Sequence, residues 1–309
     1  MRIRAIVAAV SGALALSALA VPAAQADGSA DHRADVAKVR AAAHAASGKT
    51  PYTGSTGSDG VPYTLDLSFS GVKVNGGKPI VVGTTNRVSV PVTYTVKHAA
   101  SVDITADDFL MDVEIYRGSY DEPVNGLFGD YWPSCTVTSS TAATCKGTID
   151  VDPRDQLFNE DAATWKAIGF AIAPNGVDID DPNADLSKVG FVEQDALATT
   201  KLQRYSRLTV NASPEPVKKG KTITVTGLLS RANWDTHKYA GYTVQPVGLQ
   251  FRTKSVSTYT STLKTVKSDS AGNLKTTTTA TVDGYFRYNF AGTSTTPAVK
   301  ATGDYVDVQ

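Results

Sequence analysis

The sequence predicts an all-β protein made of two tandem β-sandwich domains, and three observations lead to this prediction. Apolar and polar residues alternate with a period of two along many short stretches, most regularly in NRVSVPVTYTVKH. In the C-terminal third, turn residues separate such stretches at the roughly 8 to 12-residue spacing of a sandwich. Charge also changes sign: residues 103–195 contain 19 acidic and 5 basic residues, whereas residues 201–309 contain 6 and 15. We therefore expect an acidic domain at 61–200 and a basic domain at 205–309.

A secretory signal peptide is predicted over residues 1–26. Arg2 and Arg4 precede an uncharged run rich in Ala, Val and Leu, which ends in the small-residue site AQA before Asp27. No later stretch supplies the roughly 18 consecutive apolar residues that a membrane-spanning helix needs. The sequence therefore predicts a secreted, extracellular protein without a membrane span.

Residues 27–60 are predicted to form a flexible N-terminal arm and linker. An Ala-rich segment follows Asp35 and carries a thin apolar stripe of Val36, Val39 and Ala43, which would suit a short helix. A helix of about a dozen residues is marginal without packing, and the Thr/Gly/Ser-rich stretch behind it has the composition of a linker. The arm is therefore expected to be helical only in part.

The acidic domain is predicted to be a sandwich with one short helix. Its strand candidates are TLDLSFSGVKV, NRVSVPVTYTVKH, DVEIYRG, TIDVDP and GFAIAPNG. Pro91 cannot donate to a sheet ladder, so its strand should lie at a sheet edge or turn this position outward. The segment NEDAATWKAI has the signals of a helix, with Asn159 as N-cap and Gly169 at its end. We expect Trp165 on this segment to lie in the core.

Cys135 and Cys145 are the two cysteines of the chain. In an exported protein a pair of cysteines most often forms a disulfide. The residues between them alternate and are rich in Thr and Val, which favours a hairpin whose arms the bridge joins. A zinc site would need two further ligands nearby, and a redox pair would need the spacing C-x-x-C.

The basic domain shows seven strand candidates: RLTVNA, TITVTGLL, VGLQFR, TLKTVKS, NLKTTTTATV, YFRYNF and DYVDV. Turn signals such as SPEP, KG, SAGN and DG separate them. Seven strands over this length correspond to one immunoglobulin-sized sandwich. The residues expected to point inward are Leu208, Val210, Ile223, Val225, Val247, Leu249, Phe251, Phe286, Tyr288, Phe290, Val306 and Val308.

Residues 206–309 resemble the Ig-like modules of secreted actinobacterial and other bacterial surface proteins. The resemblance lies in LTVNASPEPVKKGKTITVTG, in VGLQFRTK with the later TYTSTLKTVKSDSAGNLKTT, and in VDGYFRYNFAG with VKATGDYVDV. It implies that the first piece supplies strands A and B, that DSAGN joins two central strands, and that GYFRYNFAG is the penultimate core strand. The whole chain is also similar to two-module secreted proteins of streptomycetes. These resemblances imply a fold and a compartment, and no particular ligand.

Aspartates gather in NGVDIDDPNAD, which contains Asp178, Asp180, Asp181 and Asp185, and in TIDVDPRD, which contains Asp150 and Asp152. Calcium prefers six to eight hard oxygen ligands, often on alternating positions around a turn. The EF-hand spacing fails in each register, because glycine and the final glutamate are missing. A calcium site assembled from separate loops, together with Asp107 and Asp108, stays open as a hypothesis. The alternative is a set of exposed turns in which the aspartates cap the backbone.

Aromatic residues in two predicted loops are the other candidate site. Tyr131 and Trp132 lie in FGDYWPSC, and Trp234 lies in RANWDTHKYAGY. Such rings would either stack on sugars or cover the end of a sandwich. No hydrolase, zinc-protease or nucleotide-binding motif occurs, and the basic residues are dispersed, so we expect neither an enzyme nor a nucleic-acid-binding protein.

The functional hypothesis is a secreted, non-enzymatic protein that binds or builds structure at the cell surface or in the extracellular matrix. Its partner would be a cell-wall polysaccharide or another extracellular protein. The alternative hypothesis is a calcium-binding extracellular protein that uses the Asp-rich loops of the first domain.

Overall fold

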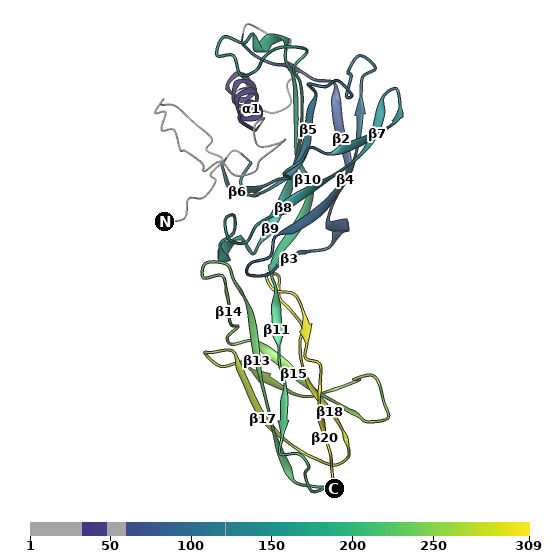
Figure 1. Ribbon diagram of the computed structural model, residues 1–309, viewed down its shortest axis with the longest axis vertical. Coiled ribbons are helices and arrows are strands. Elements are labelled where there is room, and N and C mark those ends of the chain that lie inside the picture. Colours follow the sequence, from purple (N-terminus) through teal and green to yellow (C-terminus); the bar gives the residue numbers. More distant parts are fainter. Residues whose placement is uncertain (1–32, 48–59, 121) are drawn as a thin grey trace. The chain divides into compact units, whose positions relative to one another are not determined.

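The computed structural model describes residues 33–47, 60–120 and 122–309. The predicted signal peptide and the rest of the predicted arm lie outside these residues. The chain divides into two compact units (Figure 1). Among the described residues, unit 1 comprises those up to residue 80 with 87–151 and 164–200, and unit 2 comprises 81–86, 152–163 and 201–309. Two short segments of the predicted acidic domain at 61–200 thus belong to the second unit.

Unit 1 is built from two sheets. One sheet has the order β1–β10–β9–β5–β6, with β3 paired to β10, and the other has the order β2–β4–β8–β7. The strands are β1 Tyr63–Thr64, β2 Leu67–Val74, β3 Ile80–Val82, β4 Val88–His98, β5 Leu110–Gly118, β6 Pro123–Leu127, β7 Ser134–Ser139, β8 Ala142–Val151, β9 Thr164–Ala173 and β10 Gly190–Arg204. Single 3-10 turns lie at Asn75–Gly77 and Leu186–Lys188, and a third, at Asn159–Asp161, lies in a segment that belongs to unit 2. The alternation predicted for β2 and β4 is confirmed, because Phe69, Tyr94 and Val96 are buried while their sequence neighbours face outward or lie half-buried.

The strand that contains Pro91 is central, so its predicted edge position is wrong. β4 pairs with β8 along ten residues, and its other side pairs with β2. The β2 ladder ends at Val92, one residue before it would reach Pro91, and the Pro91 side chain is exposed. The proline is therefore accommodated in the second predicted way: Pro91 points outward, and it lies beyond the end of the β2 ladder.

The helix predicted in NEDAATWKAI is not formed. Only Asn159–Asp161 makes a 3-10 turn, and the residues from Thr164 onward form β9, which lies between β5 and β10. This strand is buried on both faces, and such a strand consists of a continuous apolar run that sequence periodicity does not separate from a buried helix. A Cβ on Gly169 would lie 2.9 Å from side-chain atoms of Phe69 and Leu197, so glycine here serves close packing. Trp165 is fully buried, as predicted.

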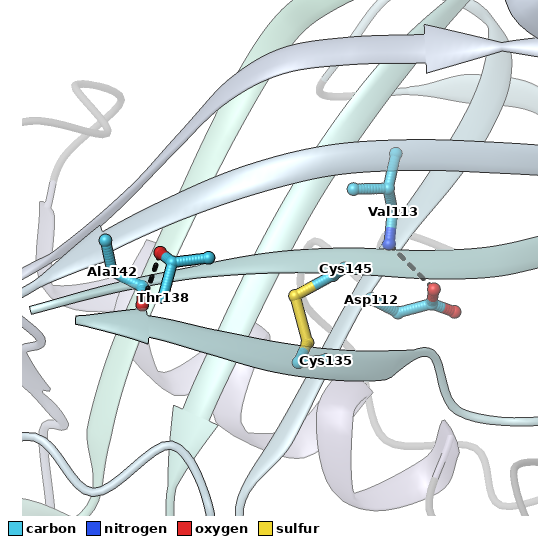
Figure 2. The surroundings of a disulfide bond; sticks show 6 residues. All are labelled: Asp112, Val113, Cys135, Thr138, Ala142 and Cys145. Carbon is cyan, nitrogen blue, oxygen red and sulfur yellow. Dashed lines mark hydrogen bonds between the residues drawn. A yellow bond between two sulfur atoms is a disulfide. The ribbon is translucent and has the colours of Figure 1, made fainter. Parts of the chain in front are cut away.

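The cysteine hairpin is confirmed. β7 and β8 are antiparallel, with Cys135 directly opposite Cys145, and a disulfide joins the two residues (Figure 2). Near the turn of the hairpin, the Thr138 hydroxyl donates a hydrogen bond of 3.0 Å to the carbonyl of Ala142. Because β7 ends its sheet, the disulfide fixes an otherwise singly paired strand to the central part of the sheet.

The helix α1, Arg33–Ser47, packs against unit 1 instead of forming part of a free arm. Val36 and Val39 are 2% and 0% exposed, and Ala42 and Ala43 pack beside them, so the predicted apolar stripe is correct. The stripe meets an apolar cluster that includes Leu110 of β5, Phe170 and Ile172 of β9, and Phe191 of β10. We call this surface of β5, β9 and β10, together with the loop at 174–189, the α1 cradle. Tertiary packing thus stabilises a helix that is marginal alone.

Unit 2 is a two-sheet, Ig-like sandwich. One sheet has the order β11–β13–β12, with β14 and β17 also paired to β13, and the other has the order β16–β15–β18–β19, with β20 paired to β18. The strands are β11 Ser206–Leu208, β12 Asn211–Ser213, β13 Thr222–Asn233, β14 Lys238–Gly241, β15 Pro246–Thr253, β16 Thr262–Lys267, β17 Asn273–Thr279, β18 Gly284–Phe290, β19 Val299–Lys300 and β20 Asp304–Val306. All twelve predicted inward residues belong to or pack against one core cluster.

The DSAGN turn joins β16 to β17, and the expectation that these are central strands is wrong. β16 ends one sheet, whereas β17 pairs with β13 of the other sheet. The turn therefore crosses between the sheets, and Asp269 stabilises it by accepting hydrogen bonds from the amides of Ala271 and Asn273, both at 2.8 Å. GYFRYNF forms the core strand β18 between β15 and the last strands, but two short strands, β19 and β20, follow it, so it is not the penultimate strand.

Candidate functional site

The loop NGVDIDDPNAD lies between β9 and β10. Its carboxylates cap their own turns: Asp178 accepts from the Asp180 amide at 3.1 Å, Asp181 from the Asn183 amide at 2.8 Å, and Asp185 from the Ser187 amide at 3.2 Å. Short acidic side chains stabilise turns in this way. Hydrogen bonds from Ser187 lower the pKa of Asp185 below its ordinary value. The loop therefore has the structural features of the capped-turn alternative.

Three other predicted acidic side chains also accept hydrogen bonds from backbone amides. Asp108 accepts a hydrogen bond of 2.8 Å from the amide of Gly176, at the start of the loop. Asp150 accepts from the amide of Asp130 at 3.0 Å, and Asp152 accepts from the amide of Arg154 at 2.9 Å. No group of three or more His, Cys, Asp or Glu side chains suited to one metal ion occurs in the described part of the chain.

A cation from the protein itself contacts the Asp-rich loop. The ammonium group of Lys38 on α1 donates hydrogen bonds of 2.6 and 2.8 Å to the carbonyl oxygens of Ile179 and Asp181. Backbone carbonyls of this kind are also calcium ligands. In this conformation they stabilise the docking of α1.

The calcium hypothesis stays a prediction with a direct test. A ligand that binds only the folded protein raises its unfolding midpoint. If calcium binds the loop, millimolar calcium should raise the midpoint of the full chain relative to chelator, and Asp178→Asn should abolish the rise. Asp269→Asn, which alters a capped turn of unit 2, is the matched control. A difference below about 1 °C between calcium and chelator would contradict calcium binding.

The three predicted ligand-stacking aromatics have different environments. Trp234 is 0% exposed, and its indole nitrogen donates a hydrogen bond of 2.8 Å to the carbonyl of Gly83, so stacking on a ligand is ruled out for this ring in the folded state. Trp132 is half-buried and packs edge-on against Phe170, with a centroid distance of 6.4 Å. Tyr131 is 68% exposed. The contact of Trp234 with Gly83 joins distant parts of the sequence, so no local pattern reveals that Trp234 is a core residue.

A buried ionic cluster lies beneath α1. Asp112 and Glu114 project from β5, and Glu193 projects from β10. Arg33 pairs with Asp112 at 2.6 Å and also with Glu114. Arg40 forms a close ion pair with Glu193, with Nε and Oε1 2.5 Å apart, and lies 3.9 Å from Glu114. His44 and Tyr120 complete the cluster through contacts with Glu193.

Burial and ion pairing shift the pKa values of Asp112 and Glu193 in opposite directions. Burial raises the pKa of Asp112 to about 7, although Arg33 opposes the shift. Burial also acts against ionisation of Glu193, but the charge of Arg40 and the hydrogen bonds from His44 and Tyr120 hold the pKa of Glu193 below its ordinary value. Glu193 is therefore ionised at neutral pH, whereas Asp112 titrates near neutral pH.

Asp112 should make unit 1 less stable as pH rises from about 4 to 7. In this interval folded Asp112 retains its proton and unfolded Asp112 has lost it, so the folded state binds more protons and the free energy of unfolding falls with rising pH. Asp112→Asn should remove this slope. The measurement is the unfolding midpoint of both proteins between pH 4 and 8, and a difference between them that does not vary with pH would contradict the shift.

The second candidate surface lies on unit 2. Arg252, at the end of β15, is opposite Tyr285 of β18, which is opposite Tyr305 of β20. Arg287 lies two residues after Tyr285 on the same face, because the intervening Phe286 points into the core. Lys254 and Tyr259 follow β15: the Lys254 ammonium contacts the Tyr305 ring, and the Tyr259 ring contacts the guanidinium groups of Arg252 and Arg287. We call Arg252, Lys254, Tyr259, Tyr285, Arg287 and Tyr305 the tyrosine–arginine face.

Cations and aromatic rings alternate across this face. The guanidinium carbon of Arg252 lies 3.9 Å from the centroid of Tyr285, and that of Arg287 lies 3.8 Å from the centroid of Tyr259. The ammonium of Lys254 lies 5.4 Å from the Tyr305 centroid, and a hydrogen bond with Tyr305 raises the pKa of Lys254. These are cation–π distances. The rings therefore hold the cations in a fixed array on one sheet face.

Most of these side chains are half-buried and already oriented. Arg287 Nε donates to Gln250 Oε1 at 2.9 Å, and Arg252 Nη1 donates to the Val256 carbonyl at 2.6 Å. For Arg287, Nε is the one guanidinium nitrogen with a hydrogen-bond partner among the described residues. The remaining N–H groups of Arg287 are thus available to a carboxylate, which a guanidinium binds through two parallel hydrogen bonds.

Comparison with known proteins finds no shared family. No protein-family profile matches the chain, and no curated protein matches it. Similar solved structures include a three-Ig I-band fragment of titin, with 8% identity and a TM-score of 0.30 over 79% of this chain and 66% of the fragment. They also include the Escherichia coli adhesin FdeC, with 16% identity and a TM-score of 0.25 over 80% of this chain and 65% of FdeC.

Dimeric latent PorU from Porphyromonas gingivalis is similar at 10% identity and a TM-score of 0.26, over 79% of this chain and 20% of PorU. The chain spans less than two thirds of each of these three structures. The assignment of an Ig-like sandwich therefore rests on the strand order of the chain itself. No helix in the described ranges is both long and apolar enough to cross a bilayer.

Proposed function

We propose that the chain is an extracellular, non-enzymatic, Ig-like binding protein, and that the tyrosine–arginine face contacts an acidic protein partner. The observation that carries this proposal is the fixed array of three tyrosines, two arginines and one lysine on one sheet face of unit 2. The signal-peptide pattern and the disulfide support an extracellular location, because disulfides persist in oxidising compartments.

The chemistry of the face favours a protein over a polysaccharide. Sugars stack on open aromatic faces, whereas Tyr259 and Tyr285 each have a guanidinium within 4 Å of the ring centroid. Tyrosine and arginine are enriched in protein interfaces and among the residues that dominate their binding energy. Stacked arginines also lose less conformational freedom on binding than free ones. The three cations select an acidic partner.

Immobilised poly-L-glutamate, a neutral glucan and an acidic polysaccharide allow a direct test with the full chain. We expect salt-dependent binding to poly-L-glutamate. Arg287→Glu should weaken this binding roughly tenfold, about 1.4 kcal/mol. Lys275→Glu, which makes the same charge change on the exposed side of β17 in the other sheet, is the matched control. Equal losses in both variants would indicate non-specific charge attraction, and preferred binding to either glycan would favour a polysaccharide partner; both results contradict the proposal.

A further inference from the structure

The helix α1 is attached to unit 1 through side chains. Among the described residues, no backbone hydrogen bond joins α1 to a strand. Its contacts include the apolar stripe around Val36 and Val39, the ion pairs of Arg33 and Arg40, and the hydrogen bonds of Lys38 to loop carbonyls. Undocking α1 would therefore leave every sheet ladder intact.

The α1 cradle is complementary to one kind of ligand. Its floor combines an apolar strip, formed by Leu110, Phe170, Ile172 and Phe191, with three acidic groups at Asp112, Glu114 and Glu193. Without a cationic occupant, the buried acids would lack their arginine partners, and an unpaired buried charge is strongly unfavourable. The cradle thus requires a short amphipathic helix that presents small apolar residues on one stripe and arginines beside it.

The sequence between α1 and β1 permits exchange of the helix. The linker at residues 48–62 reads GKTPYTGSTGSDGVP and is rich in Gly, Ser and Thr. A segment that no ladder holds and that such a linker joins can exchange between identical chains, because a second copy offers the same contacts. The linker only sets the effective concentration of the chain's own helix, on the order of millimolar.

We propose that the α1 cradle is a docking site for a basic amphipathic helix, and that α1 of a second copy of this chain is its occupant in trans. Reciprocal exchange gives a closed dimer with two equivalent cradles, each containing Arg33 and Arg40 from the partner copy. At micromolar protein concentration each cradle binds the helix of its own chain, because the effective concentration of that helix is higher. Exchange is favoured where copies are concentrated or where docking in cis is blocked. This proposal is independent of the tyrosine–arginine face.

Two complementary variants test the exchange. Arg33→Glu/Arg40→Glu carries a helix that its own acidic cradle repels, and Glu114→Lys/Glu193→Lys carries a cradle that repels its own helix. Neither variant can close in cis, but a mixture restores matched charges in both cradles. We expect each variant alone to be monomeric, and the equimolar mixture at micromolar concentration to be dimeric by light scattering. A monomeric mixture of two variants with native circular dichroism would overturn the proposal.

A peptide experiment keeps the proposal falsifiable if the cradle variant does not fold. A fluorescent peptide RADVAKVRAAAHAAS, which is α1 itself, is titrated into full-length Arg33→Glu/Arg40→Glu, whose own helix is repelled. We expect saturable binding, and at least tenfold weaker binding of a control peptide with both arginines changed to glutamate. No saturable binding, or equal binding of the two peptides, would refute helix docking by charge.

Discussion

Replacing Trp234 with alanine is expected to destabilise unit 2 by about 3 to 5 kcal/mol, the usual cost of removing a large aromatic side chain from a core. Trp234 is fully buried, and its indole nitrogen donates the hydrogen bond to the Gly83 carbonyl. The substitution therefore creates a cavity and also leaves that carbonyl without its indole donor. Since the whole stability of a domain is about 5 to 15 kcal/mol, the loss should be large in denaturant unfolding of the full chain.

The control for this substitution is Tyr131→Ala, because Tyr131 is largely exposed. Its cost should stay within about 0.5 kcal/mol, as is usual at surface sites. If the free energy of unfolding of Trp234→Ala lay within about 1 kcal/mol of that of the unmodified chain, the loss would be close to that of a surface substitution. Trp234 would then not be the core residue described above. The same pair of variants also separates core packing from ligand stacking. Loss of core packing should appear in Trp234→Ala, whereas loss of ligand stacking should appear in Tyr131→Ala, because Tyr131 is the exposed ring.

Replacing Arg40 with alanine is expected to weaken the docking of α1 by about 3 to 5 kcal/mol, the cost of breaking a buried ion pair by removing one partner. The Glu193 side chain is 3% exposed and would lose its closest cation. Alanine has the highest helix propensity, so the substitution does not weaken the helix itself. The effect should therefore appear as loss of amide hydrogen-exchange protection in α1, while the strands of unit 1 stay protected.

Arg87→Ala is the matched control, because Arg87 pairs with Asp130 through side chains that are 50% and 45% exposed. Exposed ion pairs contribute about 0 to 1 kcal/mol. Unchanged protection of α1 in Arg40→Ala would show that the apolar stripe alone holds the helix, and would remove the electrostatic basis of the α1 cradle.

Local pattern was sufficient to predict the core residues and most strands of unit 2, but it missed β14, which lies in the predicted loop RANWDTHKYAGY. Its strands have one buried face each, so a period of two in sequence directly indicates which residues form the core. The pattern failed at β9, where both faces are buried and the alternation disappears. It also did not predict β10, whose sequence GFVEQDALATTKLQR mixes buried and half-exposed polar residues because its environment changes along the strand.

The candidate sites could be predicted only where they consist of contacts between residues close together in the sequence. The capped turns of the Asp-rich loop join residues two positions apart, and the alternative of exposed turns anticipated them. The α1 cradle joins Arg33 to Asp112, 79 positions away, and His44 to Glu193, 149 positions away, which no local pattern reveals. The tyrosine–arginine face is intermediate: QFRTK and GYFRYNF contain four of its six residues, but Tyr259 and Tyr305 lie elsewhere in the sequence, and only the fold brings the six together.

Hydrogen exchange of the full chain with and without poly-L-glutamate tests the proposed binding surface most directly. Amides in β15 and β18, around Arg252, Tyr285 and Arg287, should exchange more slowly in the presence of the acidic polypeptide, and this protection should disappear in Arg287→Glu. Protection confined to other surfaces, or no change at ligand concentrations that saturate binding, would contradict the assignment of the tyrosine–arginine face as the binding site.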